Sequence, residues 1–204
     1  LEILQETSTF STGELTMVQD NPGELENGDM VLGYMADRDL VPRLCVSISP
    51  EDGTLTYRVR DSAEDDWREL MTASPLEEVS PREFSEDGDS LYVTSNTETN
   101  TTQLYRMSLE DGGKTWIAGR ERSDVAGVSW NARTGRPKVV WYNYFMRSYE
   151  ILDPAVEDDY QRISEFRDAP FSITSADHSD STWIVAYTTI QNPAESHLYD
   201  RTTG

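Results

Sequence analysis

The chain has 204 residues, 36% of them hydrophobic, and carries 38 acidic against 17 basic side chains, for a formal net charge of −21. Such a charge repels nucleic acid and anionic lipid over most of a protein surface, and no apolar stretch is long enough to span a membrane. We therefore expect neither nucleic-acid nor membrane partners. We expect a soluble protein, with the cytoplasm as the favoured compartment.

Short apolar strands recur about every 46 residues, and the steps between their central valines are 47, 47 and 45 residues. These valines are Val46, Val93, Val140 and Val185. A second register follows in the next strand of each unit, where Tyr57 and Tyr105 are 48 residues apart and Tyr199 follows Tyr105 by 94. Residues 149–153 occupy the position, between Tyr105 and Tyr199, where the third-strand segment of the intervening repeat is expected. A strand-rich repeat of this length is typical of β-propeller blades.

Taken in chain order, the repeat predicts an all-β chain, residues 1–204, that forms part of a β-propeller. Residues 1–20 are interpreted as the tail of an earlier blade, with Thr12-Gly13 as the turn into its last strand. The remaining blades are predicted at 29–71, 80–119, 125–167 and 170–204. Each should be a four-stranded antiparallel sheet, because period-two strands alternate with Asp-Gly turns that favour tight hairpins.

Both ends of the chain are predicted to cut through a blade, which would leave unpaired strand edges. We therefore expect a piece of a longer polypeptide that forms an open arc. The alternative is a small closed ring, in which the strand at 14–19 pairs beside residues 196–200 of the last blade.

The single cysteine, Cys45, is predicted to be a buried structural residue, because it lies within an apolar strand. The acidic runs are interpreted as solvated turns, and the loop at 61–67 only faintly resembles a calcium site. We expect no metal and no cofactor.

An aromatic run at 141–149 interrupts the repeat, and a short helical insertion is predicted near 154–166, with Asp153 as its N-cap and Pro154 at its first position. The favoured role of the aromatic run is packing between blades. The alternative is a surface that contacts a substrate peptide or another domain, with Arg147 as an anchor for a peptide carboxylate. The candidate contact residues are Trp141, Tyr142, Tyr144 and Arg147.

The segment from residue 29 to residue 204 resembles the propeller of the prolyl oligopeptidase family of serine peptidases, in particular its acylaminoacyl-peptidase and dipeptidyl-aminopeptidase branch. The resemblance is carried, in order, by GYMADRD (33–39), PRL (42–44), DWREL (66–70), GDSLYVTSN (88–96), LYR (104–106), DVAGV (124–128), RTGRP (133–137), LDP (152–154) and HLYDRTTG (197–204). It implies that four to five blades of a seven-bladed propeller are present. It also implies a following α/β-hydrolase domain in the parent protein, whose active site the propeller covers.

Catalysis in such enzymes depends on a serine in a Gly-x-Ser-x-Gly elbow, with an acid and a histidine. The chain has no such elbow, and the nearest string, around Ser129, lacks the final glycine and lies in a predicted strand. His178 and His197 are expected to be exposed loop residues. We therefore predict no catalytic residue in this chain, whose parent would be a peptidase acting on short peptides. The alternative is a stand-alone propeller that serves as a binding or scaffold protein without hydrolase activity.

Overall fold

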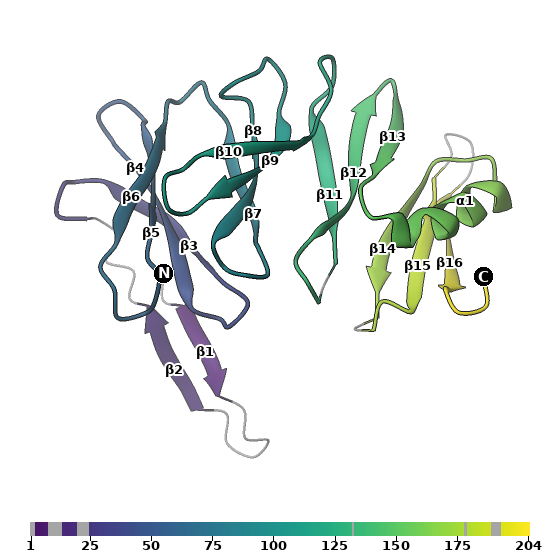
Figure 1. Cartoon of the computed structure of the whole chain (residues 1–204), viewed down its shortest axis with the longest axis horizontal. Coiled ribbons are helices and arrows are strands. Elements are labelled where there is room, and N and C mark those ends of the chain that lie inside the picture. Colours follow the sequence, from purple (N-terminus) through teal and green to yellow (C-terminus); the bar gives the residue numbers. More distant parts are fainter. Residues whose placement is uncertain (1–2, 8–13, 20–24, 132, 178, 189–192) are drawn as a thin grey trace. The chain divides into compact units, whose positions relative to one another are not determined.

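The computed structural model describes residues 3–7, 14–19, 25–131, 133–177, 179–188 and 193–204. These residues form sixteen strands, a short 3-10 helix and one α-helix, with the strands arranged in five antiparallel sheets (Figure 1). The all-β class is thus confirmed. The chain divides into two compact units, residues 1–117 and 118–204.

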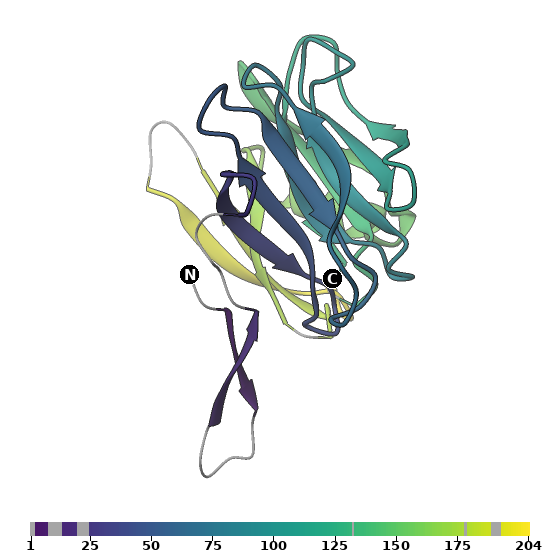
Figure 2. The same ribbon diagram turned by 90° about the vertical axis from the view of Figure 1, so that its left-hand side faces the viewer.

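The first unit begins with a separate hairpin. Strands β1 (Ile3–Thr7) and β2 (Glu14–Gln19) pair with each other antiparallel and twist about one another (Figure 2). The hydrogen-bonded partner of β2 is therefore β1. The turn predicted at Thr12-Gly13 lies outside the described residues.

Two four-stranded sheets follow, each with its strands in sequential order. The first comprises β3 (Met30–Ala36), β4 (Pro42–Ile48), β5 (Leu55–Val59) and β6 (Arg68–Ala73). The second comprises β7 (Val79–Phe84), β8 (Ser90–Ser95), β9 (Gln103–Ser108) and β10 (Lys114–Ala118). The Asp-Gly turns adopt the predicted geometry. Gly112 has φ +71°, and a Cβ there would lie 3.1 Å from the Leu70 carbonyl oxygen, so the turn favours glycine.

One hydrophobic core joins these two sheets. Leu44 and Val59 of the first sheet and Leu91 and Val93 of the second belong to the same buried cluster. A polar contact supports the packing, because the buried Tyr57 hydroxyl donates a hydrogen bond of 2.6 Å to the Val79 carbonyl oxygen.

This tyrosine should make stability depend on alkaline pH. Burial raises the pKa of Tyr57 to about 12, and the Glu78 carboxylate adds to the shift. An unfolded tyrosine titrates near pH 10, so the contribution of Tyr57 is complete below about pH 10 and is lost as pH rises towards about 12. We expect Tyr57→Phe to cost about 1 kcal/mol at pH 7, from the lost hydrogen bond, and to make the alkaline fall in unfolding free energy shallower. Urea unfolding at a series of pH values measures both, and parallel curves for the two proteins would contradict the prediction.

The second unit holds two three-stranded sheets and the helices. The first sheet comprises β11 (Val125–Trp130), β12 (Pro137–Tyr144) and β13 (Met146–Ile151), and the second β14 (Phe171–Ala176), β15 (Thr182–Tyr187) and β16 (Glu195–Asp200). The second sheet corresponds to the blade that was predicted to be cut through, and its three strands agree with that expectation, whereas the prediction of four strands is wrong for the first sheet. After β13 the chain enters a helix instead, because Pro154 cannot donate a backbone hydrogen bond and Asp153 caps the turn.

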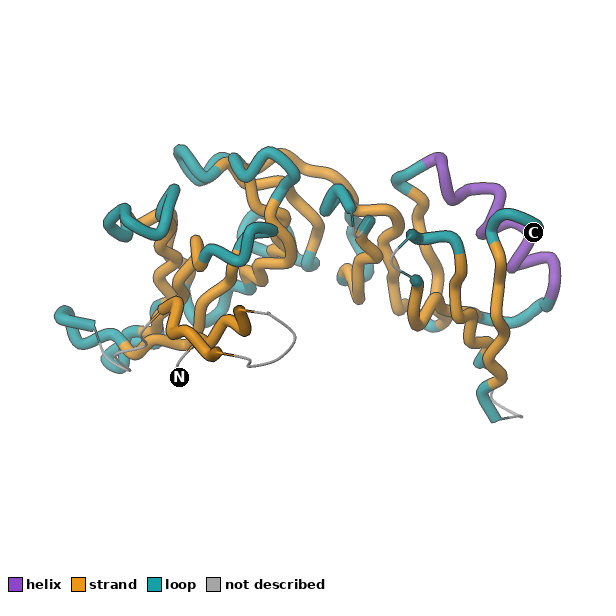
Figure 3. The backbone as a smooth tube through the Cα atoms, turned by 90° about the horizontal axis from the view of Figure 1, so that it is seen from below, coloured by secondary structure: helices purple, strands orange, loops and turns teal. Residues whose placement is uncertain are grey.

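The predicted helical insertion is confirmed. A 3-10 turn (Pro154–Val156) leads into α1 (Glu157–Phe166), and the Asp153 carboxylate accepts a 3.0 Å hydrogen bond from the Ala155 N–H. Figure 3 shows the helix lying beside the strands of its own unit. Val156 of the 3-10 turn and Tyr160 and Ile163 of α1 are buried and join a core with residues of β12, β14 and β15.

The central valines of the repeat all lie on the second strand of their sheets, β4, β8, β12 and β15. The third-strand register agrees only in part. Val46 and Val93 oppose Tyr57 and Tyr105, respectively. In the second unit, by contrast, the corresponding valines oppose Glu150 and His197. The repeat therefore predicts which strand of each sheet carries the central valine, but not which residue lies opposite that valine on the third strand.

Cys45 is buried, as predicted, and burial raises the pKa of its thiol. In the part of the chain that the structure describes, no group of three or more His, Cys, Asp or Glu side chains is placed to hold a metal ion. No helix among these same residues is long and apolar enough to cross a membrane.

Candidate peptide-contacting site

The predicted contact residues lie on the β12–β13 hairpin. Asn143 pairs with Arg147 and Tyr144 with Met146, so Phe145 alone forms the tip. Because side chains alternate along paired strands, the hairpin has two distinct faces. One, which we call the core face, carries Trp141 and Arg147. The other, the arginine face, carries Tyr142, Tyr144 and Met146 and is contacted by Arg120 and Arg122.

Trp141 anchors the core face in the protein interior. It is 5% exposed and its ring packs at 5.4 to 6.2 Å from the rings of Tyr149, Tyr160 and Phe171. Its indole N–H donates to the Ser129 hydroxyl at 3.1 Å. Trp141 therefore has the packing role that the sequence favoured for the aromatic run.

Tyr142 is also a core residue, on the opposite face. It is completely buried, and its hydroxyl donates a hydrogen bond of 2.8 Å to the Glu150 carboxylate. The Arg120 guanidinium lies 3.8 Å from the centre of its ring. Burial, reinforced by Glu150, raises the pKa of Tyr142 well above its ordinary range, so the phenol stays neutral.

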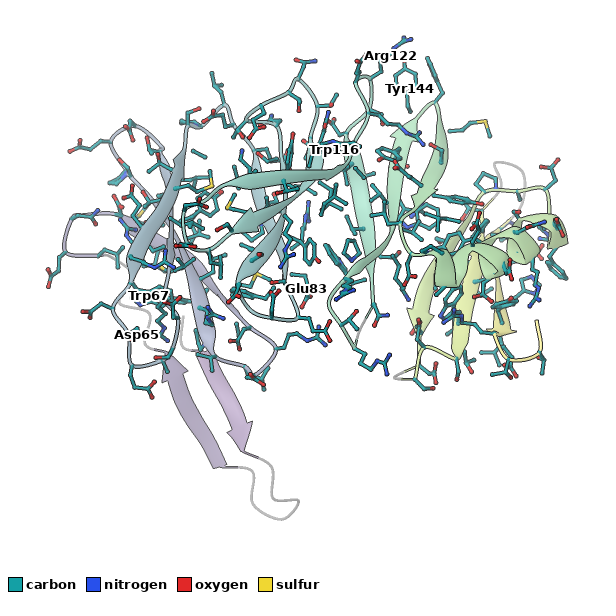
Figure 4. The ribbon with its side chains drawn as sticks, viewed as in Figure 1. Asp65, Trp67, Glu83, Trp116, Arg122 and Tyr144 are labelled. Atoms are coloured by element: carbon teal, nitrogen blue, oxygen red, sulfur yellow. The ribbon has the colours of Figure 1, made fainter. Side chains whose placement is uncertain are left out.

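Tyr144 and Arg147 remain accessible. Tyr144 is 40% exposed, and its hydroxyl accepts a 2.8 Å hydrogen bond from the Arg122 guanidinium, which also lies over its ring (Figure 4). Arg147 is exposed and lies 4.4 Å from the centre of the Trp141 ring. Of the four predicted contact residues, the structure thus leaves these two available to a ligand.

The tip is apolar and strained. Phe145 is 97% exposed and has φ +57°, a left-handed conformation that a bulky residue rarely adopts. Met146 beside it is 70% exposed. An aromatic ring in solvent on an unfavourable backbone gains little stability, and strain of this kind concentrates at functional positions.

Replacing Phe145 with glycine should therefore not destabilise the protein. The left-handed conformation costs an L-residue about 1–2 kcal/mol, whereas glycine adopts it freely but costs about 0.5–1 kcal/mol in chain entropy. We expect Phe145→Gly to leave the unfolding free energy unchanged or raise it by up to about 1 kcal/mol, as measured by urea unfolding. A loss above about 1 kcal/mol would instead show that the ring stabilises the fold.

Sequence reasoning missed Arg122, Phe145 and Met146. Arg122 is 22 positions before Tyr144, so only the pairing of strands brings the two together. The sequence feature that could have pointed to Arg122 is the pair of basic residues, Arg120 and Arg122, in a strongly acidic chain.

The possible catalytic residues do not meet in a triad within the described structure. Ser129 lies in β11, as predicted, and accepts the Trp141 hydrogen bond. His197 is not a loop residue, because it lies in β16, and its ring packs 5.4 Å from Phe166 and 5.7 Å from Tyr187. His178 lies outside the described residues.

Two known proteins are similar to this chain. Dipeptidyl aminopeptidase BIII of Pseudoxanthomonas mexicana is 27% identical over 198 residues, which make up 96% of this chain and 27% of that enzyme. A crystal structure of a puromycin hydrolase mutant complexed with PGG shares the fold, with a TM-score of 0.52 and 17% identity over 93% of this chain and 29% of that one. The resemblance to the propeller domain of the prolyl oligopeptidase family is confirmed. No family model matches the chain.

The chain spans little more than a quarter of the length of either of these two proteins. Most of each relative therefore lies outside the matched region.

Proposed function

We propose that this chain is the non-catalytic propeller portion of a prolyl oligopeptidase-like serine peptidase, in which it restricts the access of peptides to a hydrolase domain of the same parent protein. The observation that carries the proposal is the match of 96% of the chain to only 27% of a dipeptidyl aminopeptidase. In this proposal four sheets act as blades: β3–β6, β7–β10, β11–β13 and β14–β16.

Two further observations support a non-catalytic propeller portion that works with a separate hydrolase domain. The sequence has no Gly-x-Ser-x-Gly elbow, so the nucleophile would come from elsewhere in the parent protein. Successive sheets in the first unit share a core, as blades packed face to face must. The β12–β13 hairpin supplies the proposed peptide-contacting surface, through Tyr144 and Arg122, whose guanidinium contacts it.

The test compares the full-length gene product with the 204-residue chain, using dipeptidyl and acylaminoacyl p-nitroanilides. We expect the full-length protein to hydrolyse at least one class of substrate and to be inactivated by a serine-directed phosphonate. The 204-residue chain should release no p-nitroaniline.

Two results would overturn the proposal. Turnover by the 204-residue chain that is abolished by Ser129→Ala would place catalysis in the chain itself. A full-length product that lacks the serine elbow and shows no turnover would favour the stand-alone binding protein.

A further inference from the structure

Arg122 is an oriented cation without a carboxylate partner in the described part of the chain. Its guanidinium donates a 2.8 Å hydrogen bond to the Tyr144 hydroxyl and lies over that ring, 5.3 Å from its centre. Other arginines in this acidic chain do pair with carboxylates, such as Arg106 with Asp87 at 2.9 Å. A guanidinium has five N–H donors in a planar fork, so one bond to Tyr144 orients it and leaves other donors of this exposed side chain for a ligand.

The backbone around Arg122 is also constrained. Arg120 and Ser123 form a β-bridge that closes the turn in which Arg122 lies. On the same hairpin face, Tyr144 and Met146 are 40% and 70% exposed, and the Phe145 ring meets Tyr144 at 4.5 Å. An exposed cation, oriented by Tyr144, thus lies beside an apolar surface that nothing in the described structure covers.

We propose that Arg122 binds a carboxylate of a short peptide, while an apolar side chain of the same peptide rests on Tyr144, Phe145 and Met146. The inference rests on the proposed function and names the ligand group that the hairpin recognises. Carboxylate matches the guanidinium fork bidentately, and the exposed rings match an apolar side chain. Tyr144 acts as a positioning residue, since its hydroxyl orients the guanidinium.

Arg147 provides the matched control, because it belongs to the same hairpin but to the other face. Its guanidinium lies over Trp141, whereas Arg122 lies over Tyr144. One carboxylate on the arginine face cannot also engage Arg147. Neutralising either arginine changes the net charge equally, so a difference between the two variants separates direct binding from general electrostatics.

The test measures binding by the full-length gene product with isothermal titration calorimetry. The probe is Gly-Gly-Leu with N-methylated peptide bonds, which resist hydrolysis, as the free acid and as the C-terminal amide. A charge-assisted hydrogen bond to an accessible ligand corresponds to about tenfold in affinity. We expect the amide to bind about tenfold more weakly than the acid, Arg122→Gln to weaken only the acid, by about tenfold, and Arg147→Gln to change neither by more than about twofold.

Two further variants and one further peptide sharpen the result. Tyr144→Phe should weaken the acid by a smaller factor, because it removes the positioning bond and keeps the charge. Phe145→Gly should weaken Gly-Gly-Leu and leave a Gly-Gly-Gly probe unchanged. An N-methylated Gly-Glu-Leu amide distinguishes the source of the carboxylate, since binding that depends on Arg122 would assign a side-chain rather than a C-terminal group to the same site.

The proposal is overturned if the acid does not bind at millimolar concentration, if Arg122→Gln weakens acid and amide equally, or if Arg147→Gln has the same effect as Arg122→Gln. Hydrolysis is measured separately. A protein that hydrolyses peptides but is indifferent to Arg122 keeps the proposed function and loses the carboxylate site. A protein that binds the peptide through Arg122 but hydrolyses no peptide keeps the carboxylate site and loses the proposed function.

Discussion

Replacing Arg201 with alanine is expected to lower the free energy of unfolding by about 3–5 kcal/mol. Its guanidinium donates to the Asp159 carboxylate at 2.8 Å, to the Asp180 carboxylate at 3.1 Å and to the Ala155 carbonyl oxygen at 2.9 Å, and it stacks on Trp183. Asp159 is buried. Removing the arginine leaves a buried carboxylate without its charge partner, which is why the effect is large.

The matched control is Arg167→Ala. Arg167 pairs with Glu195 at 2.7 Å, but both side chains are more than a third exposed, so we expect a loss below about 1 kcal/mol. Urea unfolding of the two variants at pH 7 measures the difference. Equal losses would show that the Arg201 network contributes no more than a surface ion pair.

Trp141→Ala is expected to cost about 3–5 kcal/mol, because it leaves a cavity at the centre of the aromatic cluster that joins β12, α1 and β14. Tyr149, Tyr160 and Phe171 would each lose a ring contact. The hydrogen bond from the indole to Ser129 would also be lost. The loss of near-ultraviolet circular dichroism and the shift of the urea midpoint measure the effect.

Tyr144→Ala, three residues along the same strand, is the comparison. Its ring is 40% exposed, so we expect a loss below about 1 kcal/mol. Similar losses at the two positions would contradict the division of this hairpin into a buried base and an accessible tip.

This division matters for the proposed site. Trp141 packs in the core of the second unit and Tyr142 is completely buried, so packing holds the base of the hairpin whose tip carries Tyr144 and Phe145. A binding group on a rigid element loses less entropy when its ligand binds.

The sequence by itself determined the features that depend on neighbouring residues. Period-two strands and Asp-Gly turns predicted the antiparallel sheets, because alternation and positive φ are local properties. Asp153 and Pro154 predicted the start of the helix for the same reason, since capping involves only the residues of one turn. The family resemblance followed from the order of such local pieces.

The tertiary structure alone decided which members of the aromatic run are buried and that Arg122 has no carboxylate partner among the described residues. Trp141 and Tyr144 are both aromatic and belong to one strand, yet only Trp141 contacts α1, which begins sixteen residues later at Glu157. Arg122 reaches Tyr144 across 22 positions, and Arg201 reaches Asp159 across 42. Such partners are set by strand pairing and packing between elements, which no local pattern of residues encodes.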